Sequence, residues 1–378
     1  TAASAYTFNA KQEVRVPNRF REAFNQAWRA MRDNFYDEKL GGRDWNKIRE
    51  KYVGMAAEAP DGATLANVIN LMLGELNGSH LGFYYRGPSY SPIAQGSSWS
   101  HTTAHLGVRF EPDHKGDGLR IRDVIKGGPA DRKESRLNAG EVITSIDGKD
   151  VDGNTDLTAI LNGVPDRDIV LNVKESKKKK ATSRTVKLRP TSYARIRSLL
   201  YEKWIDDNQA KVDAESDGSF GYLHIAGMNM TSFYRFEEEL YSVAAGKDGI
   251  IIDVRENGGG STTDHLLTIL TQPRHAITIP RGGGRGYPQD RKIYASWHKP
   301  VVVLCNQNSY SNAEIFSHAI KHLKRGKVVG VPTAGGVIST GSKTIMDLGY
   351  IRMPFRGWYR MEDGQDMELQ PAQPHYVV

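Results

Sequence analysis

The sequence predicts an α/β protein in three parts: a helical N-terminal subdomain over residues 1–100, an inserted β-rich domain over 101–190, and an open α/β domain over 191–378. Three observations support this prediction. Apolar residues near the N-terminus recur with helical spacing, short β-like runs fill the middle, and buried strands alternate with helices afterwards. A chain of 378 residues is long enough for two or three such domains, each with its own core.

The N-terminal part has the apolar pattern of amphipathic helices. Between Phe20 and Phe35, apolar residues recur at steps of three and four, which predicts the first helix. A second helix is expected to begin at Asp61-Gly62 and to end at Asn77-Gly78, where glycine after an apolar stripe is a stop signal. The pair Ser79-His80 then lies just past a helix C-terminus, in a turn that can hold both side chains in a defined orientation.

The middle part has the pattern of a small β domain. Residues 87–102 are rich in Ser, Pro and Gly and are expected to form a linker. The lysine run at 177–180 is interpreted as a solvated hairpin tip rather than a nucleic-acid site. The clearest β-like runs are Leu106–Phe110, Leu119–Val124, Ile169–Val173 and Thr185–Leu188.

Composition excludes several functional classes. The net charge of +7, from 51 basic and 44 acidic residues, is mild for this length, and no run of about 18 apolar residues occurs. The single cysteine, Cys305, lies in an apolar run and is interpreted as a buried small side chain. No strong metal-ligand spacing is present, and His318 is interpreted as a packing or surface residue of a helix. We therefore expect no cofactor, metal site, nucleic-acid partner or membrane span, and the compartment stays open between cytoplasm and periplasm.

The C-terminal part alternates buried strands and helices. Continuous apolar runs at Gly249–Arg255 and Pro300–Leu304 are typical of strands buried in a parallel sheet, and a helix is predicted after each. Such sheets bind ligands at the carboxyl ends of their strands. Functional residues of this part are therefore expected directly C-terminal to these two runs.

Ser311 is the candidate nucleophile. It lies shortly after a buried strand and immediately before a helix, where the helix N-terminus can stabilise an oxyanion through the N–H of Asn312. A serine in this position is more often only the N-cap of the helix, and Ser309 is a competing candidate. Position alone does not decide between a cap and a nucleophile.

A glycine loop lies at the end of the other buried strand. The string Asn257-Gly258-Gly259-Gly260 lets backbone N–H groups approach a ligand closely. A phosphate site is the alternative, but the loop lacks the Gly-Lys-Ser/Thr ending of a P-loop and the GxGxxG spacing. The phosphate alternative is therefore disfavoured.

Residues 103–190 resemble a PDZ domain. The motifs are Leu106-Gly107-Val108, then Gly128-Pro129-Ala130, then a Leu-x-Ala-Gly-Glu-x-Ile-x-x-Ile-Asp-Gly string that ends at Gly148. The resemblance implies that an extended peptide adds as a strand, and that backbone N–H groups near Leu106 and Gly107 hold its terminal carboxylate. The alternative is a purely structural or regulatory module.

The order of motifs along nearly the whole chain resembles the tricorn-type branch of the S41 serine peptidases, relatives of the C-terminal processing proteases. The resemblance implies a ClpP/crotonase-like fold for the open α/β domain, hydrolysis of peptides or unfolded protein segments, no cofactor, and a tendency to form homo-oligomers. The motifs are Ser79-His80, the PDZ-like module, the strand with Asn257–Gly260, Ser311–Phe316, and Gly330–Gly336.

The sequence also indicates which of two S41 bases is present. Processing proteases place a lysine in a Thr-x-Gly-Lys-Gly string, but here Gly336 stands at the lysine position and Lys343 follows only seven residues later. The tricorn-type resemblance implies a tetrad instead. In it, Ser311 is the nucleophile, His80 is its base, and Ser79 with a late glutamate orients the histidine.

Glu368 is the expected glutamate of the tetrad. It begins a string that matches the family pattern Glu-x-x-Gly-x-x-Pro-Asp in part, since Pro371 replaces the glycine and His375 the aspartate. Glu362 is the runner-up.

The resemblance also implies an oxyanion hole. One donor is the N–H of Asn312, and the other comes from Gly258 or Gly259. Two functional hypotheses follow: a serine peptidase that forms an acyl-enzyme on Ser311, or a catalytically weak or inactive peptide-binding scaffold that acts through the PDZ-like module.

Overall fold

The computed structural model describes residues 13–88, 102–165, 167–175, 182–273, 279, 281–283 and 295–378. Contacts between Cα atoms divide the chain into two compact units, one made of Thr1–Gly96 with Ser216–Val378 and the other of Ser97–Glu215. The first unit therefore combines both ends of the sequence. The second groups residues 191–215 with the β-rich part, past the boundary expected at residue 190.

Helices form the N-terminal part of the first unit. They are α1 (Val16–Asn34), α2 (Trp45–Ala57) and α3 (Gly62–Gly74), with a short 3₁₀ turn at Leu40–Gly42. The Asp61 side chain caps α3 by accepting from the N–H of Thr64 at 2.8 Å. The helix predicted between Phe20 and Phe35 and the one predicted after Asp61 are both confirmed.

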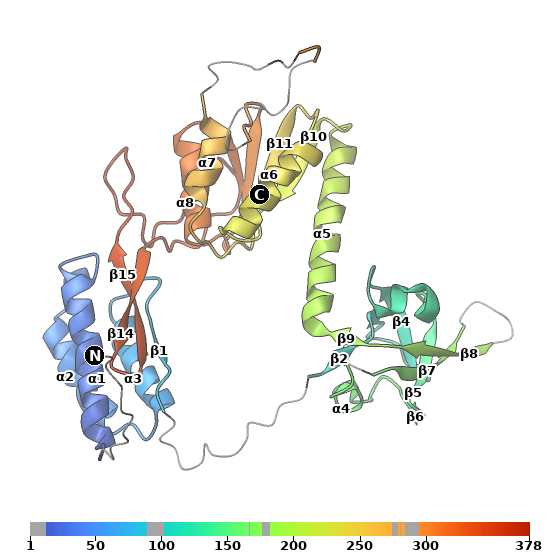
Figure 1. Ribbon diagram of the computed structural model, residues 1–378, viewed down its shortest axis with the longest axis horizontal. Coiled ribbons are helices and arrows are strands. Elements are labelled where there is room, and N and C mark those ends of the chain that lie inside the picture. The colour runs from blue at the N-terminus through green and yellow to red at the C-terminus, as the bar shows by residue number, and fades with distance from the viewer. Residues whose placement is uncertain are drawn as a thin grey trace, which may run out of the picture. The chain divides into compact units, whose positions relative to one another are not determined.

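The sequence pattern suggested an entirely helical N-terminal region, but the structure also contains a β-strand there. Strand β1 (Gly82–Tyr85) pairs antiparallel with β15 (Gly349–Arg356), which in turn pairs with β14 (Ser339–Ile345). The β14–β15 hairpin packs on the helices through Ile345 and Ile351, and Figure 1 shows it in red beside the blue helices. Local periodicity could not reveal a strand whose partner lies so far along the chain. This pairing fixes the segment that contains His80 in the same unit as the C-terminal part.

The C-terminal part contains a parallel five-stranded sheet of order β10-β11-β12-β13-β16. Helices α6 (Met230–Ser242), α7 (Thr263–Thr271) and α8 (Asn312–His322) connect and cover its strands (Figure 1). The predicted open α/β architecture and its two central buried strands are confirmed. Cys305 is buried as predicted. The strands are β10 (Phe220–His224), β11 (Gly249–Asp253), β12 (Val301–Cys305), β13 (Lys327–Gly330) and β16 (Tyr376–Val377).

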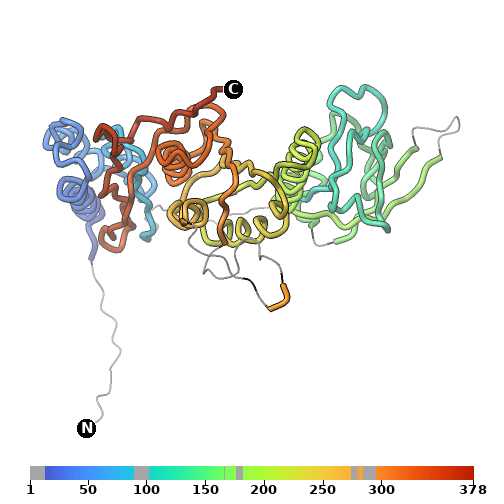
Figure 2. Tube along the Cα trace, turned by 90° about the horizontal axis from the view of Figure 1, so that it is seen from above, coloured from blue at the N-terminus to red at the C-terminus, as the bar shows by residue number. Residues whose placement is uncertain are grey.

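The second unit is the β-rich domain with its own core. Its helices are α4 (Leu157–Leu161) and α5 (Tyr193–Glu215), and the trace of this unit is drawn from teal to yellow-green in Figure 2. The expected linker and the lysine run at 177–180 lie outside the described residues, apart from the linker's ends. Among the described residues, no helix combines the length and apolar character needed to cross a bilayer. The strands are β2 (Ala104–His105), β3 (Val108–Phe110), β4 (Leu119–Val124), β5 (Val142–Ile146), β6 (Lys149–Asp150), β7 (Ile169–Lys174), β8 (Ser183–Leu188) and β9 (Thr191–Ser192).

Candidate active site

Ser311 lies at the junction between strand β12 and helix α8. It occupies the N-cap position of α8 with φ 58° and ψ −120°, a conformation that a residue with a side chain rarely adopts. Such a backbone persists only where the surroundings hold it, and it is found mainly at functional sites. Ser311 is thus at the cap position, and its hydroxyl also faces His80.

His80 lies in the turn between α3 and β1, also with positive φ (61°). Its Nε2 is 2.9 Å from Ser311 Oγ, and its Nδ1 is 2.6 Å from Ser79 Oγ. The Ser79 hydroxyl donates to Glu368 Oε2 at 3.0 Å. The structure therefore brings all four residues of the expected tetrad together in one chain of contacts.

The contacts of Glu368 indicate where the protons lie. This buried carboxylate also accepts from the N–H of Ser79 at 2.6 Å and from the N–H of Val337 at 2.9 Å. Because an ionised carboxylate only accepts, the Ser79 hydroxyl donates to it and must accept from Nδ1–H of His80. That tautomer leaves Nε2 without a proton, ready to accept from Ser311. Glu362, the runner-up, is exposed and pairs with His322 instead.

Burial keeps His80 neutral. Its side chain is only 7% exposed, and this burial, together with the positive charge of Arg352, lowers the pKa of His80 to about 4. A general base must be unprotonated to work. His80 is therefore available as a base throughout the neutral and mildly acidic range.

Replacing Arg352 with glutamine should move the acidic limb of kcat/KM to higher pH. The positive charge of Arg352 opposes protonation of His80, so its removal raises the pKa from about 4 towards the ordinary value of 6.5, while burial keeps it below that value. The pH profile of kcat/KM measures this pKa in the free enzyme. Lys343→Gln is the matched control, because Lys343 is an exposed cation on the neighbouring strand β14. An unchanged profile in Arg352→Gln would contradict the assignment of His80 as the base.

Tyr310 is a site residue to which the sequence analysis gave no role. Its ring stacks on His80 with centroids 4.7 Å apart and planes 14° apart, and its hydroxyl lies 3.0 Å from Nδ1. Burial raises the pKa of Tyr310, so the phenol stays neutral. Tyr310 therefore restrains the plane of the imidazole. In the sequence, only its position next to Ser311 indicates that Tyr310 could belong to the site.

Glu314 is a second site residue that the sequence alone does not reveal. It is buried, and its carboxylate accepts from the N–H groups of Ser311 (3.0 Å), Gly336 (2.8 Å) and Gly335 (2.5 Å) and from the hydroxyl of Thr333 (2.6 Å). Four donors satisfy its two oxygens without a cation. Glu314 thereby joins the turn at Ser311 to the segment from Thr333 to Gly336.

Gly336, where processing proteases have their lysine, has no room for a side chain. A Cβ at this position would lie 2.5 Å from Cε2 of Tyr310 and 2.9 Å from Cβ of Ser79. Ser79 and Tyr310 therefore occupy the space next to the backbone from which a lysine would extend. Lys343 is exposed on β14, and its charge acts on Asp33 of helix α1.

Replacing Gly336 with alanine should destabilise the protein by about 1–3 kcal/mol, because the added methyl overpacks a filled site. It should also lower kcat, because both Ser79 and Tyr310 must shift and both contact His80. Gly341→Ala in β14 is the control, since its Cβ would meet the Phe355 ring at an ordinary 3.6 Å. Chemical unfolding and steady-state kinetics measure the two effects. Equal free energies of unfolding and equal kcat values in Gly336→Ala and Gly341→Ala would contradict this account.

The glycine loop lies directly against Ser311. A Cβ at Gly259 (φ 89°) would lie 2.6 Å from Cβ of Ser311, so only glycine fits there. The N–H of Gly259 donates to Oδ1 of the buried Asn257 at 2.9 Å. A Cβ at Gly258, by contrast, would meet open space. Of the two glycines named as donors, Gly259 thus already uses its N–H within the loop.

The side chain of Asn312 has a structural task. Its Oδ1 accepts from the N–H of Thr263 at 2.9 Å, which joins the start of α7 to the start of α8. As the first residue of α8, Asn312 has a main-chain N–H that lacks an acceptor within the helix. The main chain, not the side chain, is therefore the part that can contact a ligand.

Ser309, the competing nucleophile, has no exposed surface. Its hydroxyl donates to the carbonyl of Val254 at 2.8 Å and accepts from the N–H of Asn306 at 3.0 Å. These contacts tie the end of β12 to the end of β11. Ser309 is a structural residue in this arrangement.

An open cleft of about 580 Å³ leads to Ser311 and His80. Asp264 and Arg352 place one acidic and one basic side chain on its wall. The other lining residues are Gly258, Gly259, Gly260, Ser261, Tyr310, Asn312, Ile315, Val337, Ile338, Ser339, Thr340 and Trp358.

The second unit has a groove of about 260 Å³ between β3 and α4. Leu106 is one of its lining residues, and Gly107 (φ 83°) follows in the loop. The N–H of Gly107 donates to Nδ1 of His105 at 2.9 Å. This N–H, predicted to bind a peptide carboxylate, is therefore already paired with His105, which would have to turn away.

Comparison with known proteins gives three family matches in succession. Residues 17–74 match the tricorn protease C1 domain, residues 104–188 a PDZ domain, and residues 219–378 peptidase family S41. Each match falls on one of the parts described above. The predicted PDZ-like character of the middle part is confirmed.

Similar proteins extend the match to almost the whole chain. A tricorn protease homolog of Saccharolobus solfataricus is 28% identical over 97% of this chain and 33% of its own length. Tricorn protease homolog 1 of Streptomyces coelicolor is 28% identical over 97% of this chain and 34% of its own length. The crystal structure of the tricorn protease shares the fold, with a TM-score of 0.75 at 23% identity over 96% of this chain and 34% of that one. The chain spans about a third of the length of these relatives. It is similar to tricorn proteases along almost its whole length, and its residues 219–378 match peptidase family S41.

Proposed function

We propose that the protein hydrolyses peptide bonds through an acyl-enzyme on Ser311, with His80, Ser79 and Glu368 completing a catalytic tetrad. The observation that carries this proposal is the unbroken chain of contacts from Ser311 Oγ through His80 and Ser79 to Glu368. The names of the relatives, which are proteases, agree with it.

In the first half of the reaction, Ser311 Oγ attacks the peptide carbonyl while His80 Nε2 takes its proton. The imidazolium that forms is stabilised through Ser79 by the negative charge of Glu368. The N–H groups of Asn312 and Gly258 are the proposed donors to the oxyanion, because Gly259 donates to Asn257. His80 then protonates the leaving amine, which departs and leaves an ester on Ser311.

In the second half, water takes the place of the amine. His80 accepts a proton from the water as its oxygen attacks the ester, and returns it to Ser311 Oγ when the ester bond breaks. The acid product leaves and the resting state is restored. No cofactor is needed, because both protons pass through one imidazole.

Peptides or unfolded protein segments are the proposed substrates. The cleft is open and lined by mixed polar and apolar residues, which suits an extended chain better than a small molecule. The groove of the second unit is the proposed docking site for a second stretch of extended peptide, added along β3.

Replacing Glu368 with glutamine should lower kcat by about 10²–10⁴-fold, because the neutral amide no longer stabilises the imidazolium and can donate to Ser79, which favours the wrong tautomer of His80. Glu362→Gln, the same change at the exposed runner-up, should lower kcat by less than about tenfold, because Glu362 does not contact Ser79 or His80. Steady-state kinetics on one peptide substrate compares the two. Equal losses in both variants, or no loss in Glu368→Gln, would remove Glu368 from the tetrad.

The function itself is tested by incubating the protein with a library of unmodified peptides and identifying products by mass spectrometry. We expect cleavage at internal peptide bonds that depends on Ser311. Binding of peptides without any product would instead support the scaffold hypothesis, in which only the groove of the second unit is used.

A further inference from the structure

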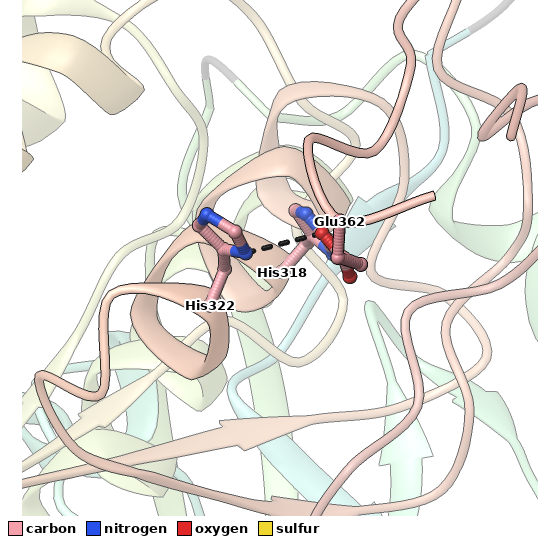
Figure 3. A group of neighbouring side chains, drawn as sticks. All are labelled: His318, His322 and Glu362. Carbon is pink, nitrogen blue, oxygen red and sulfur yellow. Dashed lines mark ion pairs between the residues drawn. The ribbon is translucent and has the colours of Figure 1, made fainter. Parts of the chain in front are cut away.

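Two histidines of helix α8 face one glutamate outside the proposed tetrad. His318 and His322 are four residues apart and so lie on one face of the helix, with ring centroids 5.7 Å apart and planes 16° apart. Glu362 comes from the segment after β15, and its Oε2 is 3.1 Å from Nδ1 of His322. One potential ligand atom from each of the three lies within 4.8 Å of the others. Figure 3 shows the three side chains gathered beside the helix.

We propose that His318, His322 and Glu362 form a binding site for a divalent transition-metal ion such as Zn²⁺. Two imidazole nitrogens and one carboxylate oxygen are ligands that Zn²⁺ prefers, whereas Mg²⁺ and Ca²⁺ prefer oxygen alone. Histidines at i and i+4 of a helix present their nitrogens to one ion. A water molecule would occupy the fourth position.

The three side chains need only a small movement to close around an ion. In a tetrahedral site with bonds of about 2.0–2.1 Å, ligand atoms are roughly 3.4 Å apart. His322 Nδ1 and Glu362 Oε2 already meet this spacing. Both of these side chains are exposed and can rotate towards His318, which is half-buried in the helix and fixes the position of the site.

The charges around the site permit a cation. The carboxylate of Glu362 supplies one negative charge to the site. Lys321 and Arg360 are the nearby positive groups. The guanidinium of Arg360 is held by Asp363 at 2.6 Å. A simple His322–Glu362 ion pair is the alternative, and it requires His322 to be protonated.

The site would act as a brace. Glu362 lies near the tip of a segment whose arms pair through Arg360 N–H to Gln365 O (2.9 Å) and Met367 N–H to Trp358 O (2.8 Å). Glu368 follows this segment directly, and α8 begins immediately after Ser311. A bound ion would therefore join the helix that follows the nucleophile to the segment that precedes Glu368. The metal site stands on its own contacts, whether or not Ser311 is a nucleophile.

The test is a titration of the chelator-treated protein with ZnCl₂ at neutral pH by isothermal calorimetry. We expect one saturable equivalent, with affinity lowered at least about tenfold in Glu362→Gln and in His322→Asn, since even residues that only support a ligand cost that much. Glu202→Gln removes an exposed carboxylate of the second unit and should bind as the unmodified protein does. Zn²⁺ in excess should also raise the midpoint of thermal unfolding of the unmodified protein, but not of His322→Asn.

Replacing Zn²⁺ with Co²⁺ adds a spectroscopic signature, the intense visible absorption of a four-coordinate ion, which should be lost in His318→Asn. Absence of saturable binding would overturn the proposal. So would one equivalent that binds equally well to all three ligand variants, because the ion would then lie elsewhere.

Discussion

Replacing Ser311 with alanine should lower kcat for peptide hydrolysis by at least about 10⁴-fold while the protein stays folded. The nucleophile is lost, and residual catalysis by the oxyanion hole and substrate binding alone is small. The loss of an N-cap hydroxyl should cost about 1 kcal/mol of stability. Steady-state kinetics and chemical unfolding on the same sample separate the two effects.

Ser309→Ala is the matched control for this variant. It removes a hydroxyl two residues away that has two buried hydrogen bonds, to Val254 and from Asn306. We expect it to destabilise the protein by about 1–3 kcal/mol and to leave kcat for peptide hydrolysis largely unchanged. A folded Ser309→Ala that is inactive, beside an active Ser311→Ala, would reverse the assignment of the nucleophile.

Replacing His80 with alanine should reduce kcat by about as much as the loss of Ser311, because a serine without its base is a poor nucleophile near neutral pH. The variant leaves a hole beside Tyr310 that opens into the cleft. Added imidazole should therefore restore part of the activity, in proportion to the concentration of its neutral form. Kinetics over a series of imidazole concentrations measures the rescue.

His298→Ala controls for the loss of an imidazole in general. His298 is exposed ahead of β12 and does not line the cleft, so this variant should keep its kcat without rescue. Retention of more than a tenth of the activity in His80→Ala would point to another base.

The sequence predicts much of the fold for physical reasons that particular elements illustrate. The buried strands β11 and β12 are short, continuous apolar runs, and α1 shows its core face by spacing alone. Strand β1, in contrast, has four residues and pairs with β15 across most of the chain. No local pattern encodes such a partner.

The sequence likewise predicted only some of the residues of the candidate site. The positions of Ser311 and the glycine loop follow from strand and helix ends, whereas the roles of Ser79, His80 and Glu368 came from a family resemblance. Tyr310 and Glu314 were missed because their function lies in contacts: one stacks on His80, and the other gathers four donors from two segments. His318 was likewise interpreted as a packing or surface residue, since Glu362 is brought to it only by folding.

The most direct test of the central claim, that neutral His80 activates Ser311, is the rate of fluorophosphonate labelling as a function of pH, with the adduct located by mass spectrometry. The account predicts a single adduct on Ser311, a rate that falls only as the pH approaches the His80 pKa of about 4, and unchanged labelling in Lys343→Ala. An adduct on Ser309 would contradict the account. So would a labelling rate that already decreases as the pH drops below an alkaline pKa and that is lost in Lys343→Ala.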